Sequence, residues 1–113
     1  MKCKRGELWW VDFNPARGSE QAGQRPALVV QNDIGNKYAA TTIVVAVSSR
    51  IADYPQNVTL SATEESGLSQ NSCAKCGQVL TLAQDRLIEK IGEVSAQSMN
   101  DVDQALSLSL GLV

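Results

Sequence analysis

The chain has 113 residues, 43% of them hydrophobic, which fits one folded domain spanning residues 1–113 and excludes a disordered chain. Ten basic and twelve acidic residues give a net charge of −2, whereas nucleic-acid-binding domains are usually basic. Seven of the basic residues but only four of the acidic ones lie in residues 1–50, so the net charge does not exclude a local basic surface.

The first half of the chain predicts three strands. Residues 8–13 are rich in aromatic side chains, with Trp9 and Trp10 expected on opposite faces of a strand. A long polar loop with several glycines follows at residues 14–24, and residues 26–31 predict a second, buried strand. After a turn that has room for a short helical piece, residues 41–48 form the strongest strand signal, because they are almost entirely β-branched.

The second half predicts shorter strands and one terminal helix. Strands are expected at residues 57–60, 72–82 and 87–94, with loops at 49–56 and 64–70 and a helical turn at 83–86. Ser95 is the expected N-cap of the helix. The apolar residues that then fall on one helix face are Met99, Val102, Leu106 and Leu110. This order predicts a mainly β fold, a small curled sheet or barrel with a helix packed on it.

The chain contains no histidine, which removes most standard catalytic machinery. A Ser-His-Asp triad, a Cys-His pair and a histidine acid or base are all excluded, and no glycine-rich phosphate loop is present. No cofactor and no metal site are expected, because a structural zinc site needs four ligands and only Cys3 could join Cys73 and Cys76. We interpret Cys73 and Cys76 as buried or half-buried structural residues.

The location of the protein follows from two absences in the sequence. No apolar stretch is long enough to span a membrane, and none follows the basic N-terminus as a signal peptide would require. A cytoplasmic protein with no membrane association is therefore expected.

The polar loop before Pro26 is the candidate functional segment. It brings Arg17, Ser19, Glu20, Gln21 and Arg25 within a short span, and its glycines let the backbone approach a ligand. Loops on a rigid scaffold often carry binding and catalytic groups. The spacing alone does not separate such a role from a solvated loop with incidental charges.

Three segments carry a resemblance to a known family: RGELWWVDFNP at residues 5–15, GSEQ at 18–21 and RPALVVQND at 25–33. They closely resemble the MazF/PemK/Kid family of toxins. The likeness continues through residues 41–48, 78–82 and 85–87 and the C-terminal helix, so it covers nearly the whole chain. The resemblance implies a CcdB/Kid/MazF-like fold, that is, a small SH3-like curled β-barrel with a C-terminal α-helix, assembled as a homodimer.

The resemblance also implies an activity. It indicates the toxin of a type II toxin–antitoxin system, an mRNA interferase that cleaves single-stranded mRNA at specific sequences without a metal and is inhibited by a cognate MazE-like antitoxin. In such cleavage the 2′-hydroxyl of the RNA attacks the adjacent phosphate, which leaves a 2′,3′-cyclic phosphate and a 5′-hydroxyl.

The family's catalytic residues fall on two positions of this chain. Its arginine falls on Arg25, which can supply paired donors to phosphate oxygens. Its hydroxyl residue, usually threonine, falls on Ser48, with the adjacent Ser49 as the alternative. The residues expected to bind RNA are Arg17, Ser19, Glu20, Gln21, Ser49, Tyr54, Asn57 and Gln78.

Two aspects of the reaction are left open by the sequence. The general base is not evident, and Glu20 is a candidate that equally fits a binding role. Many relatives have an acidic residue just before the glutamine where this chain has Gly77, and this departure leaves open which nucleobases the chain prefers.

Two other functions remain alternatives. A CcdB-like toxin would bind a protein target, gyrase, without nuclease activity, and an inactive SH3-like domain would serve only as an interaction module. The R-P motif at Arg25 and the hydroxyl at the end of the strand favour the nuclease, because a CcdB-like toxin needs no catalytic arginine.

Overall fold

The computed structural model describes residues 2–14 and 23–113, and in this part of the chain six strands form one antiparallel sheet in the order β4-β5-β3-β2-β1-β6. The elements are β1 (Glu7–Asp12), β2 (Gln24–Val29), α1 (Asp33–Tyr38), β3 (Thr41–Ser48), β4 (Asn57–Leu60), β5 (Ser72–Ala83), the 3-10 turn η2 (Gln84–Arg86), β6 (Leu87–Glu93) and α2 (Ala96–Ser109). None of the helices described is long and apolar enough to cross a membrane.

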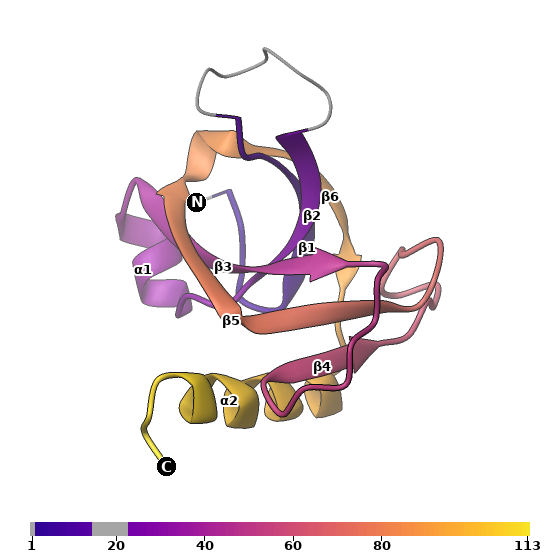
Figure 1. The fold of residues 1–113 in the computed structure, drawn as a ribbon. Helices are drawn as coiled ribbons and strands as arrows, with labels where there is room; N and C mark the ends of the chain where they lie inside the picture. The colour runs from indigo at the N-terminus through magenta and orange to yellow at the C-terminus, as the bar shows by residue number, and fades with distance from the viewer. Residues whose placement is uncertain (1, 15–22) are drawn as a thin grey trace.

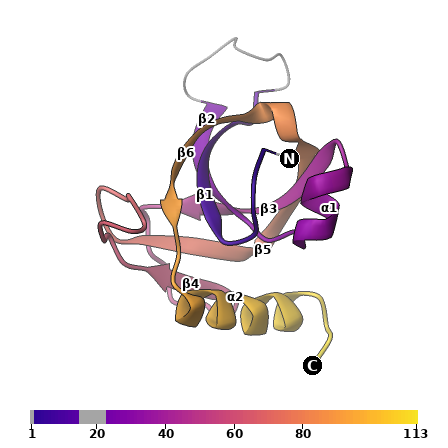
Figure 2. The same cartoon turned by 180° about the vertical axis from the view of Figure 1, so that it is seen from behind.

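The sheet curls strongly around a central space, and α2 lies beneath it beside β4 (Figure 1, Figure 2). This confirms the predicted curled sheet with a C-terminal helix. The sheet is not closed by hydrogen bonds, since β4 and β6 are its two edges. The loop between β4 and β5 packs against β6 instead: Glu93 N donates to Glu65 O at 2.8 Å, and a Cβ on Gly92 would lie only 2.3 Å from Ser66 O.

Two hydrophobic cores lie on opposite faces of the curled sheet. Leu8 and Leu28 belong to the core between the sheet and α2, whereas their neighbours Trp9 and Ala27 belong to the core inside the curl. Successive residues of a strand point to opposite faces. The strand β1 is therefore buried on both sides over most of its length, and β2 is buried on both sides in its second half, as its continuous apolar run predicts.

A bulge bends β5 between Lys75 and Val79. Val45 of β3 pairs with Val79, but the next residue, Ala46, pairs with Lys75, so three residues of β5 (76–78) have no partner on β3. Such bulges bend a strand and redirect its side chains. Cys73 and Cys76 are both buried and free, as expected, and burial, with a smaller contribution from Cys73, raises the pKa of Cys76 to about 11.

The terminal helix begins as predicted and ends earlier. Ser95 Oγ accepts a hydrogen bond from Ser98 N at 3.1 Å, which is the N-cap geometry. Val102 and Ala105 are its buried residues. The expectation that Leu110 shares the packed face is wrong: Leu110 is the C-cap, 59% exposed, because Gly111 at φ +71° turns the chain away.

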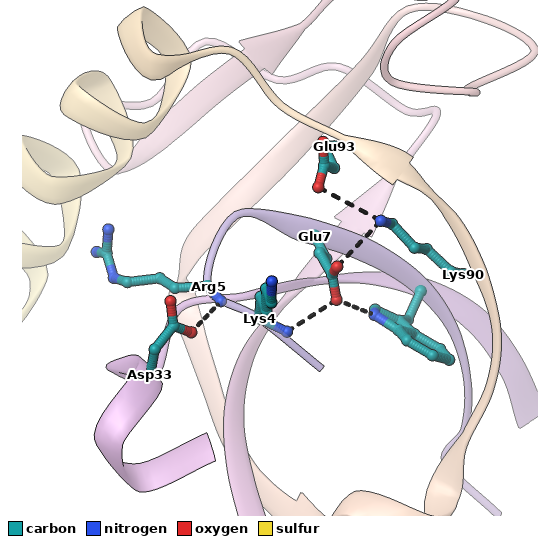
Figure 3. A network of polar contacts seen from close by, with 7 residues as sticks. Lys4, Arg5, Glu7, Asp33, Lys90 and Glu93 are labelled. Atoms are coloured by element: carbon teal, nitrogen blue, oxygen red, sulfur yellow. Dashed lines mark hydrogen bonds and ion pairs between the residues drawn. The ribbon is translucent and has the colours of Figure 1, made fainter. Parts of the chain in front are cut away.

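A buried carboxylate joins the N-terminal segment to β6 (Figure 3). Glu7 Oε1 accepts from Lys4 N at 2.8 Å and from Trp9 Nε1 at 3.0 Å, and Glu7 Oε2 lies 3.0 Å from Lys90 Nζ. Burial on its own would raise the pKa of Glu7, but these hydrogen bonds outweigh it and hold the pKa below its ordinary value of 4.5. The ionised carboxylate therefore stabilises the fold.

Glu7→Gln should flatten the loss of stability in acid. Because the pKa of Glu7 is lower in the folded protein, the unfolded chain binds this proton first as the pH falls, and the free energy of unfolding decreases. Glutamine keeps an acceptor for Trp9 and Lys4 but loses the charge opposite Lys90. We expect a loss of about 1–2 kcal/mol at neutral pH and a shallower acid limb, both measured by urea unfolding.

Glu89→Gln is the matched control, because Glu89 is exposed on the same strand, β6. It should follow the wild-type dependence on pH. An acid limb in Glu7→Gln as steep as that of the wild type would contradict the assignment.

Candidate active site

A cavity of about 720 Å³ opens where β2 begins and β3 ends. Arg25, at the start of β2, and Ser48, the last residue of β3, both line it. Ser49 and Gln78 line it too, so four of the residues selected from the sequence come together here. No Asp or Glu of the described residues is part of its lining, which leaves the cavity positive.

The pairing of β2 with β3 explains why Arg25 and Ser48 meet. Ala27 pairs with Ala46, and continuing this antiparallel register by two residues places Arg25 opposite Ser48. Residues directly opposite in neighbouring strands share a face, with Cβ atoms about 4.5–5.5 Å apart. Two residues 23 positions apart in the sequence thereby present their side chains to one ligand.

The hydrogen bonds of the pair suit an anionic ligand. Ser48 Oγ accepts from Arg50 N at 3.1 Å, so its own hydroxyl hydrogen is available as a donor. Arg25 is exposed and makes no ion pair with any described residue. The two side chains therefore offer a guanidinium and a hydroxyl donor at the same place.

Lys75 is a second cation in the cavity and was not predicted from the sequence as a site residue. Ser48 pairs with Cys73 of β5, and Lys75 lies two residues further along the same strand, paired with Ala46. Lys75 is therefore on the same face as Ser48. It is half-buried and makes no ion pair within the described residues. The signal available in the sequence was its position two residues after Cys73 on a strand expected beside residues 41–48, because residues two apart on a strand share a face.

Trp10 is the other lining residue left without a definite role by the sequence. Trp9 and Trp10 do lie on opposite faces, as expected: Trp9 is buried and bonded to Glu7, whereas Trp10 is 42% exposed. In the cavity, Trp10 is accompanied by Pro26, Leu68 and Ile91, so one part of the wall is apolar.

The remaining residues selected from the sequence do not join this cluster. Asn57 lines a different cavity, between β4 and α2, and its Nδ2 donates to Ala52 O at 2.9 Å. Tyr54 is 60% exposed in the loop before β4. Arg17, Ser19, Glu20 and Gln21 lie outside the described residues. Within the described residues, no three Cys, Asp or Glu side chains are grouped closely enough to hold a metal ion.

The loop that carries four of these residues is anchored at both ends. Phe13 N donates to Gly23 O at 2.9 Å, which closes the two chain segments on each other. Arg86 of η2 donates from Nη1 to Asp12 O at 3.0 Å and to Asn14 O at 2.7 Å. These contacts fix the end of β1 beside Arg25, whose partner in β1 is Val11.

Residues 4–110 match the family of PemK-like, MazF-like toxins of type II toxin–antitoxin systems. The chain is also 40% identical over 115 residues to the endoribonuclease EndoA of Bacillus subtilis (strain 168), an alignment that covers 100% of this chain and 98% of that protein.

Solved structures show the same fold. A chain of a MazE–MazF structure from Deinococcus radiodurans is 30% identical, with a TM-score of 0.81 and coverage of 100% of this chain and 99% of that one. An endoribonuclease from a mycobacterial species, solved with its cognate antitoxin, is 24% identical with a TM-score of 0.79, covering 98% of this chain and 97% of that one. At this lower identity the likeness concerns the fold.

Proposed function

The chain belongs to the PemK-like, MazF-like toxins of type II toxin–antitoxin systems, and from this premise we propose that it is an endoribonuclease that cuts single-stranded mRNA without a metal ion. The observation that carries the proposal is that Arg25 and Ser48 line one positive cavity, where the β2–β3 register, continued by two residues, sets them opposite each other. The relative with 40% identity over the whole chain is an endoribonuclease. A CcdB-like gyrase inhibitor is not favoured.

The proposed reaction uses the RNA as its own nucleophile. The 2′-oxygen attacks the adjacent phosphorus and loses its proton, the bond from phosphorus to the 5′-oxygen breaks, and that oxygen gains a proton. The products are a 2′,3′-cyclic phosphate and a 5′-hydroxyl. The negative charge that builds up on the phosphate oxygens needs donors placed in advance, which is often the largest catalytic contribution.

Arg25 and Ser48 are the donors on this proposal. The guanidinium of Arg25 can donate two parallel hydrogen bonds to the phosphate. Ser48 Oγ, which already accepts from Arg50 N, can donate its hydrogen to a phosphate oxygen or to the 2′-oxygen. Ser49 stays the alternative hydroxyl, and Glu20 stays the candidate general base, since no described carboxylate lines the cavity.

The RNA on either side of the cut would follow the cavity. Lys75 offers a second positive charge for a neighbouring phosphate, and Gln78 offers an amide for the edge of a base. The other proposed RNA contacts are Arg17, Ser19, Glu20 and Gln21 in the loop before β2, with Tyr54 and Asn57 further along the chain.

The proposed partners are a MazE-like antitoxin and a second copy of the chain, in the cytoplasm. Relatives in the MazE–MazF structures are solved with their antitoxins. The homodimer is supported by an exposed apolar surface at the second half of β5 and the C-terminus, where a shallow cavity joins Val79 to Leu108 and Leu110. The large exposed side chains of this surface are Val79, Leu108 and Leu110.

Arg25→Ala should reduce the rate of cleavage of a long single-stranded RNA, assayed with EDTA, by at least about 100-fold. The loss should lie mainly in kcat, because the guanidinium binds charge that develops in the transition state. Arg50→Ala is the matched control: Arg50 is an exposed arginine outside the cavity lining. Cleavage by Arg25→Ala at the wild-type rate would remove Arg25 from the mechanism.

Lys75→Met should weaken RNA binding and make it less sensitive to salt. Loss of one phosphate contact on a single strand reduces the slope of log K against log salt by about 0.7. The measurement is fluorescence anisotropy with RNA that carries 2′-O-methyl groups and cannot be cut. Lys37→Met on α1 removes the same charge outside the cavity and should keep the wild-type slope; an equal change in both variants would exclude a local contact of Lys75.

Val79→Asp should convert the proposed dimer to a monomer, because Val79 lines the shallow cavity with Leu108 and Leu110 and a buried, unpaired charge at an interface costs several kcal/mol. Sedimentation velocity measures the change. Ile88→Asp is the control, since Ile88 is 48% exposed on β6, away from this surface. Two variants with the same sedimentation as the wild type would place the interface elsewhere.

A further inference from the structure

The apolar part of the cavity is a distinct feature beside the Arg25–Ser48 pair. We propose that Trp10, Pro26, Leu68 and Ile91 form a subsite for one nucleobase of the RNA strand, with the indole of Trp10 as its stacking face. This inference rests on the proposed function and adds a binding contact to it.

The side chain of Trp10 is partly exposed to solvent. A large aromatic side chain left 42% exposed keeps apolar area in contact with water, and burying that area stabilises a complex. Its indole nitrogen makes no hydrogen bond within the described residues, whereas that of Trp9 is bonded to Glu7 at 3.0 Å. Trp10 is thus the tryptophan that combines an exposed side chain with a donor that has no partner among the described residues.

The proposed subsite includes the residue that follows Arg25 in the sequence. Pro26 directly follows Arg25 and pairs with Trp10 across β1 and β2. Arg25 and Pro26 are successive residues of β2 and both line the cavity, so one cavity takes in side chains from both faces of the strand. On this proposal, a strand of RNA with a phosphate at Arg25 places the base of a nearby nucleotide at Trp10.

The charged and uncharged parts of the cavity lining determine where the phosphate and the base of a nucleotide bind. Arg25 and Lys75 are the cations of the described lining, and both lie on the face of Ser48. Among the described residues, the wall around Trp10 carries no charge, so a phosphate gains no ionic contact there. A nucleobase stacks on an aromatic ring regardless of sequence. Polar side chains for the edge of the base are close by, because Ser69 and Gln70 continue the lining.

The part of the lining that accompanies Trp10 is held in place by the close packing of the β4–β5 loop on β6. Gly67 adopts φ +68°, and a Cβ at this position would lie 2.1 Å from Ile91 O. The loop residue Leu68 and the strand residue Ile91 are thereby fixed side by side. The subsite is formed before any ligand binds, which lowers the entropy cost of binding.

Trp10→Ala should weaken the binding of uncleavable 2′-O-methyl RNA roughly 5- to 150-fold, the loss expected for one stacked base. Trp10→Phe keeps an aromatic face and should lose much less. Tyr38→Ala is the matched control, because Tyr38 is 77% exposed on α1 and outside the cavity. Thermal unfolding and sedimentation of each variant report on its fold and its oligomeric state.

Tryptophan fluorescence adds a readout that a purely structural role would not give. RNA should quench the wild-type signal, and Trp10→Phe, in which only Trp9 still emits, should bind RNA with little quenching. RNA with one abasic position, moved stepwise along the strand, should lose the quenching at a single position while the other abasic RNAs retain it.

Four results would overturn the subsite. The first is Trp10→Ala binding RNA as tightly as the wild type, and the second is quenching that no abasic position removes. The third is a changed oligomeric state in Trp10→Ala, which would assign the surface to a second copy. The fourth is loss of antitoxin binding with unchanged RNA binding, which would assign it to the antitoxin. If the wild type binds no RNA at all, the proposed function fails and the subsite with it.

Discussion

The central strands of this protein are buried on both of their faces, and the position of the functional site follows from that constraint. In β1 and β2, one set of alternate residues packs in the core between the sheet and α2, and the other set packs in the core inside the curl. Neither face of the middle of these strands has room for polar side chains. Arg25 and Ser48 lie where β2 begins and β3 ends, away from the buried middle, and Lys75 lines the same cavity from β5.

Ends of strands are also where backbone groups lose their partners, and polar side chains replace them here. Gln84, nearly buried, donates from Nε2 to Asn36 O at 2.8 Å and to Ala39 O at 3.0 Å, which attaches η2 to the connection between α1 and β3. Arg86, two residues later, holds the end of β1 through Asp12 O and Asn14 O. Because these contacts fix the backbone at the ends of the strands, Arg25 stays in position without an ion pair to any described residue. Its charge therefore remains available for a ligand.

Much of this architecture could be predicted from local sequence patterns. The β-branched run at residues 41–48 is a strand, and Ser95 does cap the last helix, since these signals depend on neighbouring residues only. The family resemblance selected Arg25 and Ser48, but the reason that they meet is the β2–β3 register, which no local spacing contains. Lys75 was missed for a similar reason: the bulge at residues 76–78 sets which residues of β5 share a face with Ser48, and the bulge forms only when β5 pairs with β3.

The net charge of −2 and the positive cavity are reconciled by where the acidic residues lie. Asp101 and Asp103 line the cavity between β4 and α2, and Glu64 and Glu65 line another beside β6, whereas the described lining around Arg25 has no acidic residue. Charges further apart than about 8–10 Å are largely screened at physiological salt. A polyanion is therefore repelled from the two acidic cavities and attracted to the one that holds Arg25 and Lys75.

Charge alone does not distinguish RNA from an acidic protein segment, because both carry negative groups along a flexible chain. The uncharged wall at Trp10 supplies that distinction, since a nucleic acid places a flat aromatic base at a fixed distance from each phosphate and a peptide does not.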